Sequence, residues 1–241
     1  MTAVLLFFAA VLGGAIASLA GFGIGSILTP LLALSVGTKQ AVVAVSIPHL
    51  VATSIRFWNL RHRIDRHLLA NFGIASAAGG LLGAWLGSRF SSPVLAYILG
   101  GLLVFAGLSG LTGLSRKMRF GKKIAWLGGA LSGLLGGLVG NQGGVRSAAM
   151  LGFNLEAKVF VATATAIALI VDGARMPIYF FTSPETVHRL AASIAVMVAG
   201  VTIGTIVGGR VLAHIPENYF RKIVSLLILA LGIVMLTRVA K

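Results

Sequence analysis

The chain has 241 residues, of which 57% are hydrophobic and only 10% are charged, and its mean hydropathy is +0.99. A soluble domain carries about a quarter charged residues, so this composition excludes a water-covered globular protein and predicts an all-α integral membrane protein. The net charge of +15 does not indicate nucleic-acid binding, because Lys and Arg fall mostly at the ends of apolar runs, where they anchor membrane helices.

About eight apolar runs are candidates for membrane segments, since a span needs about 20 apolar residues. The first run begins without a basic stretch or a cleavage site, which indicates a membrane segment and not a signal peptide. The first and fifth runs are too long for one crossing and are the richest in glycine, so we expect broken or re-entrant helices there. The runs lie near 2–36, 41–58, 68–88, 93–114, 124–152, 159–181, 190–209 and 223–237.

A basic linker, SRKMRFGKK at 115–123, separates a first membrane repeat at 1–114 from a second at 124–241. LGGA occurs at 12–15 and again at 127–130, each time just before a glycine-rich segment. Further along, GLLGAWLGSR at 80–89 matches GVTIGTIVGGR at 200–210. Spaced identities in the same order indicate a duplicated unit.

Matching loops of the two repeats carry opposite charge biases. The first repeat has Arg61, Arg63 and Arg66 where the second has Arg189 alone. Parallel repeats would place matching loops on one side of the membrane with similar charge, so the opposed biases favour inverted repeats, a common plan of secondary transporters. This arrangement predicts both termini outside and the linker in the cytoplasm. Parallel repeats with eight spans are the alternative.

The glycine breaks at 21–25 and 140–144 are the strongest functional signal. A broken helix exposes backbone N–H groups at the positive end of its dipole, and these bind anions without a side chain. The alternative is that glycine only allows close helix packing, which we prefer for the fourfold-spaced glycines at 79–87 and 200–208. The predicted substrate-binding residues of the breaks are Gly21, Gly23, Gly25, Ser26, Asn141, Gln142, Gly143 and Gly144.

Three arginines, Arg56, Arg146 and Arg175, lie within apolar runs. A charge at such a place costs at least about 2.5 kcal/mol and usually marks a site or a buried pair. Arg146 follows the second break, so we predict that it binds an anion. Arg175 lies three residues after Asp172, which allows a structural ion pair on one helical face as well as a role in the site. Arg56 lacks such an acid and either joins the site or snorkels to the interface.

Asp172 is the only acid well inside a predicted span and is therefore the one carboxylate candidate for proton coupling, although its neighbouring arginine opposes protonation. His49 is the only histidine within a span, and we interpret it as a packed polar residue. Paired carboxylates, metal-ligand spacings and a nucleophile elbow are missing, so we predict no enzyme activity, no catalytic residue, no metal and no cofactor.

Two segments, GFGIGSILTPLLAL at 21–34 and GGLVGNQGGVRSAAMLG at 136–152, together with the repeated halves, resemble the sulfite exporter (TauE/SafE) family of membrane permeases over essentially the whole chain. The second segment departs from the usual glycine cluster by carrying Asn141-Gln142 and by having Ala149 where the first has Pro30. The resemblance implies a multi-pass protein of the bacterial inner membrane that moves sulfite or an organosulfonate.

The residues themselves predict a carrier that holds a small anion between the two glycine breaks, within the lipid bilayer and without nucleic acid. An acid-poor interior suits an anion better than a cation. An anion channel with the same site and a membrane assembly factor without transport are the rival interpretations. The sequence is also compatible with a homodimer.

Overall fold

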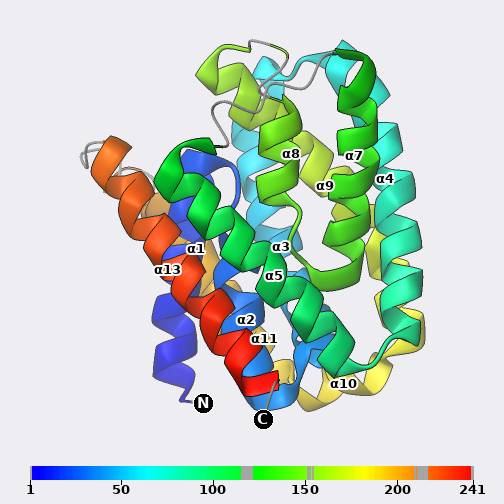
Figure 1. The fold of residues 1–241 in the computed structure, drawn as a ribbon, viewed down its shortest axis with the longest axis vertical. Coiled ribbons are helices and arrows are strands. Elements are labelled where there is room, and N and C mark those ends of the chain that lie inside the picture. Colours follow the sequence, from blue (N-terminus) through cyan, green and yellow to red (C-terminus); the bar gives the residue numbers. More distant parts are fainter. Residues whose placement is uncertain are drawn as a thin grey trace.

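The computed structural model describes residues 2–114, 122–150, 153, 155–208, 210 and 217–239, and these residues form helices joined by short turns (Figure 1). The first half comprises α1 (Ala3–Ala20), α2 (Ile24–Val36), α3 (Thr38–Leu60), the short turn η1 (Arg61–Arg63), α4 (Arg66–Arg89) and α5 (Ser92–Thr112). The second half comprises α7 (Lys122–Val139), α8 (Gly143–Met150), α9 (Ala157–Thr182), α10 (Pro184–Arg189), α11 (Ala191–Ile203), the π-helical turn η3 (Gly204–Gly208) and α13 (Glu217–Val239).

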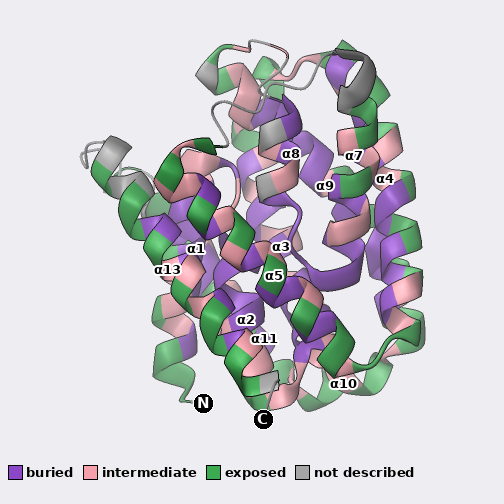
Figure 2. Cartoon of the chain, viewed as in Figure 1, coloured by how far each residue is buried: buried purple, intermediate pink, exposed green. Residues whose placement is uncertain are grey.

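Several helices have the length and apolar composition of membrane spans. Five of the described helices qualify, namely Ala3–Ala20, Thr38–Arg63, Arg66–Arg89, Ser92–Thr112 and Lys158–Thr182. Three shorter apolar helices, Ile24–Val36, Trp126–Val139 and Ala191–Val207, accompany them. Large apolar residues such as Phe181, Trp58 and Phe8 are exposed, and exposed positions recur along the outer faces of the helices (Figure 2). The predicted all-α membrane protein is therefore confirmed.

The two halves run in opposite directions through the molecule. In Figure 1, α1 begins and α13 ends at the lower end of the view, whereas α5 ends and α7 begins toward the upper end. α1, the first helix of the first half, therefore runs upward in this view, whereas α7, the first helix of the second half, runs downward. Both chain ends lie at the same end of the molecule.

Helix pairing between the halves is reciprocal. α4 lies along α7, and α1 lies along α11 and η3, so each half packs a later helix on the first helix of the other half. Glycine makes this approach possible, because a Cβ on Gly83 would lie 2.0 Å from the Leu134 carbonyl oxygen and a Cβ on Gly204 would lie 2.0 Å from that of Val11. The packing interpretation is thereby confirmed at these two positions. α5 pairs with α13, and α3 packs on α9.

Candidate functional site

Both glycine-rich runs are broken helices, as predicted. α1 ends at Ala20, and the chain turns through Gly21 (φ 76°) and Gly23 (φ 142°) before α2 begins. α7 ends at Val139, and Gly140 (φ 71°) leads into the turn before α8. These backbone angles lie in the region that only glycine adopts readily.

The breaks are shorter than expected. Gly25 belongs to the first turn of α2, and Gly143 and Gly144 belong to α8. Pro30 lies well inside α2 and does not contribute to the turn. A helix needs only a few non-helical residues to stop and restart, which the residue pattern alone does not resolve.

The two breaks contact each other in the buried interior. The Ser26 hydroxyl donates a hydrogen bond to Asn141 Oδ1 over 3.2 Å, and both side chains are buried. A Cβ on Gly25 would lie 2.1 Å from the Gly140 carbonyl oxygen, and a Cβ on Gly143 would lie 2.1 Å from Phe22 Cβ. The absence of side chains at these glycines is what allows the breaks to meet. The surroundings of Gly144 lie outside the described side chains.

The breaks bring two helix N-termini into this region. The first helical hydrogen bond after the first break runs from Ile27 N–H to the Gly23 carbonyl oxygen. The first after the second break runs from Arg146 N–H to the Gln142 carbonyl oxygen, and each is 3.1 Å long. The N–H groups of the residues before Ile27 in α2 and before Arg146 in α8 therefore lack acceptors in their own helices. Each N-terminus also carries the positive end of a helix dipole.

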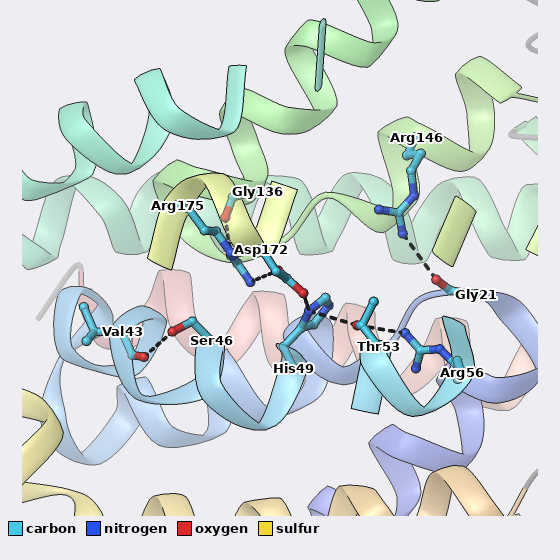
Figure 3. Close-up of polar contacts among 10 residues, drawn as sticks. All are labelled: Gly21, Val43, Ser46, His49, Thr53, Arg56, Gly136, Arg146, Asp172 and Arg175. Atoms are coloured by element: carbon cyan, nitrogen blue, oxygen red, sulfur yellow. Dashed lines mark hydrogen bonds and ion pairs between the residues drawn. The ribbon is translucent and has the colours of Figure 1, made fainter. Parts of the chain in front are cut away.

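A buried ion pair on α9 is confirmed, and it has a third member. Asp172 Oδ1 lies 2.7 Å from Arg175 Nη2, and Asp172 Oδ2 lies 2.7 Å from His49 Nδ1 on α3 (Figure 3). The Asp172 side chain is fully buried and the other two are nearly so. Two partners on two helices hold one carboxylate, as a buried charge requires.

Arg175 and Tyr179 also stabilise the broken end of α7. Arg175 Nη1 donates to the Gly136 carbonyl oxygen over 2.6 Å, and the Tyr179 hydroxyl donates to that of Gly137. The last carbonyl groups of a helix lack partners within it, and a cation near this end is favourable. Tyr179 also lines a surface pocket near the start of α3, where Lys39 Nζ donates to the Ser88 carbonyl oxygen over 2.6 Å.

Arg56 is buried, with an exposed fraction of 4%, so the interpretation that it snorkels to the interface is wrong. It lies a turn before the exposed residues of η1 and faces inward. Its Nη2 donates to Thr53 Oγ1 over 3.2 Å, and Thr53 Oγ1 lies 3.4 Å from His49 Nδ1. Arg56 Nε and Nη1 have no partner in the part of the chain that the structure describes.

Arg146 lies in α8 just after the second break, with an exposed fraction of 2%. Its Nη2 donates to the Gly21 carbonyl oxygen of the first break over 3.3 Å, so this arginine spans the two breaks (Figure 3). Among the described residues, Arg146 Nε and Nη1 have no partner, and neither do the buried amide atoms of Gln142 nor the hydroxyl of Thr29. Buried polar groups are normally satisfied, so the guanidinium and amide N–H donors here lack an acceptor, and Gln142 Oε1 lacks a donor.

The charges of this interior do not balance. Among the described buried residues, three arginines face one carboxylate, which leaves two positive charges uncompensated while His49 is neutral. Arg146 lies within electrostatic range of Arg56, Asp172 and Arg175. Such an arrangement binds an anion favourably, because the anion supplies both the missing charge and the missing acceptors.

Sequence reasoning missed His49 and Thr53 as members of this cluster. A signal was present, because residues 49, 53 and 56 are spaced by four and three and therefore share one helical face. Residues 172, 175 and 179 repeat such a face on α9. Two polar faces on otherwise apolar helices predict that the helices contact each other through them.

Residues 6–235 match the family model described as Sulfite exporter TauE/SafE. A search of curated proteins found no match, and a search of solved structures found none either. Because the family match spans nearly the whole chain, the protein belongs to the TauE/SafE sulfite exporter family and is a multi-pass membrane transport protein.

Proposed function

We propose that this TauE/SafE protein is a secondary transporter of the inner membrane that binds a small oxyanion, such as sulfite or an organosulfonate, between its two helix breaks. The observation that carries the proposal is the uncompensated charge of the interior. Arg56, Arg146 and Arg175 are buried with Asp172 as the one acidic side chain among the described buried residues. Buried charge is tolerated only when it is paired, and a bound anion completes the pairing.

Arg56 and Arg146 are the main anion ligands in this proposal. Each has Nε and Nη1 without a partner among the described residues, and a planar guanidinium can offer two parallel N–H groups to an oxyanion. Gln142, the first turns of α2 and α8, and the glycines of the breaks supply further donors and the space for a close approach. Arg175 contributes mainly its charge, because Asp172 and Gly136 already occupy its Nη groups.

Binding of sulfite to purified Arg146→Gln protein tests the proposal. Losing a hydrogen bond to a charged group costs about 1.5–3 kcal/mol, so affinity should fall roughly tenfold to hundredfold, and Arg146→Lys should lose less. The matched control is Arg63→Gln, which removes an arginine from the exposed turn η1 and should leave affinity unchanged. Wild-type affinity in folded Arg146→Gln protein would remove Arg146 from the site.

A carrier and an anion channel with the same site differ in one measurable property. A carrier exchanges substrate across the membrane, so an internal load of unlabelled sulfite should drive uptake of labelled sulfite into liposomes against its gradient. A channel lacks this counterflow. The broken helices support a carrier, because such helices form the sites of many secondary transporters.

The opposed directions and reciprocal pairing of the two halves support inverted repeats. On this proposal both termini lie outside and the linker between α5 and α7 lies in the cytoplasm, where Lys and Arg accumulate. Reporter fusions at Ser115 and Lys241 should report opposite sides of the membrane. Two cytoplasmic signals would contradict the inverted arrangement.

A further inference from the structure

His49 occupies a position in the charged interior that the proposed anion site does not explain. It is buried on α3, with an exposed fraction of 7%, and its Nδ1 lies 2.7 Å from Asp172 Oδ2. Anion binding by the arginines does not require a neutral imidazole beside a carboxylate. A histidine, however, is the side chain whose charge changes most readily near neutral pH.

The hydrogen bond to Asp172 determines which nitrogen can take a proton. Asp172 is paired with Arg175 and is therefore ionised, and an ionised carboxylate only accepts hydrogen bonds. His49 Nδ1 must then carry the hydrogen of this bond, which leaves Nε2 as the basic nitrogen. A proton taken from water adds to Nε2 without breaking the contact with Asp172.

The charged groups that face His49 are Asp172 and Arg175 on α9 and Arg56 on its own helix. The other helices packed on α3 bring no described buried titratable group toward it. Neither α2, α11 nor η3 contains a titratable residue, and α7 has none among its described side chains. The titratable residues of η1, α10 and α5 are all exposed, namely Arg61, His62, Arg63, Glu185, His188, Arg189 and Tyr97.

Charge balance links this proton to the anion. The empty cluster already has two uncompensated positive charges, so a third on His49 is disfavoured. An anion bound by Arg56 and Arg146 reduces this excess, by two charges if it is a dianion and by one if it is a monoanion, so a proton on His49 is then less disfavoured. By reciprocity, a proton on His49 strengthens anion binding by the same factor.

We propose that His49 is the proton-binding residue of this transporter and that it takes up one proton from water at Nε2 when the anion binds. The inference rests on the proposed anion site. A carrier that reorients with both the anion and this proton bound therefore moves the two across the membrane together. Asp172, the one carboxylate candidate for proton coupling in the sequence, stays ionised and positions His49.

Calorimetric titration with sulfate and with isethionate tests this inference, because neither anion changes its own charge between about pH 5.5 and 8.5, so any proton taken up belongs to the protein. Titrations in buffers of different protonation enthalpy should give about one proton bound per anion in the wild type. Affinity should rise by up to about tenfold for each unit that the pH falls through the titration of His49. His49→Asn keeps an amide near Asp172 but has no basic nitrogen, so its proton uptake should be zero and its affinity independent of pH.

The control His62→Asn removes an exposed histidine of η1 and should retain the uptake. Anion binding by the wild type without proton uptake, or uptake that persists in His49→Asn, would overturn the role of His49 while leaving the anion site intact. No binding of sulfite, sulfate or isethionate to the wild type would overturn the proposed function and this inference together. The wild-type measurement decides the inference even where His49→Asn does not fold.

Discussion

Arg56 on α3 and Arg175 on α9 lie 119 residues apart, one in each half, and their surroundings differ. Three residues before Arg175 lies Asp172, which pairs with it at 2.7 Å. Three residues before Arg56 lies Thr53, which accepts one hydrogen bond of 3.2 Å. Arg175 also bonds to the Gly136 carbonyl oxygen, so only its Nε lacks a partner among the described residues, whereas Arg56 lacks one at both Nε and Nη1.

The comparison shows that two buried arginines can have different environments. In the second half Arg175 is neutralised and stabilises the end of α7. In the first half Arg56 is a buried charge with donors that have no partner among the described residues. Seven residues before Arg56 lies His49, whereas seven residues before Arg175 lies Ala168, so only the first half has a titratable residue at this spacing.

Asp172→Asn should destabilise the protein most, because it breaks the buried ion pair and leaves Arg175 buried without a counter-charge. Removing one partner of a buried ion pair costs about 3–5 kcal/mol, measurable as a lower thermal midpoint in detergent. Asp65→Asn is the control, since Asp65 caps α4 by accepting from Leu68 N–H over 2.9 Å and asparagine caps equally well. Equal midpoints for the two variants would show that the pair contributes nothing to folding.

Thr53→Asp should give Arg56 an acidic residue at the spacing that Asp172 has from Arg175. A carboxylate beside Arg56 would supply the missing counter-charge, so sulfite affinity should fall about tenfold or more, because the anion would lose the charge-assisted bonds worth about 1.5–3 kcal/mol. The matched control is Thr53→Asn, which has nearly the same shape and no charge. If both variants bind sulfite as the wild type does, Arg56 is not an anion ligand.

Tyr179→Phe should have the smallest effect. It removes the hydroxyl that donates to the Gly137 carbonyl oxygen at the end of α7 and keeps the ring beside Arg175. One neutral hydrogen bond contributes about 0.5–1.5 kcal/mol, so the thermal midpoint should fall by a few degrees, roughly 2–4 °C per kcal/mol for a chain of this size. A loss as large as that of Asp172→Asn would mean that the second half depends on Tyr179 as much as on its ion pair.

Local patterns were sufficient for the helical segments, the two breaks and the Asp172–Arg175 pair. Apolar run length predicts membrane helices, and dense glycine predicts where a helix stops. A spacing of three residues places two side chains on one helical face. Each of these inferences concerns residues that are close in the chain, and the helical period alone determines how such residues lie relative to one another.

Contacts between helices far apart in the chain were decided by packing. His49 meets Asp172 across 123 residues, and Arg146 reaches Gly21 across 125. Whether Arg56 faces the interior or the interface depends on the rotation of α3 against α9, which side-chain packing sets and hydropathy does not. The sequence alone thus indicated a membrane protein with charges in its interior, whereas the association of helices determined which of those charges lack a counter-charge.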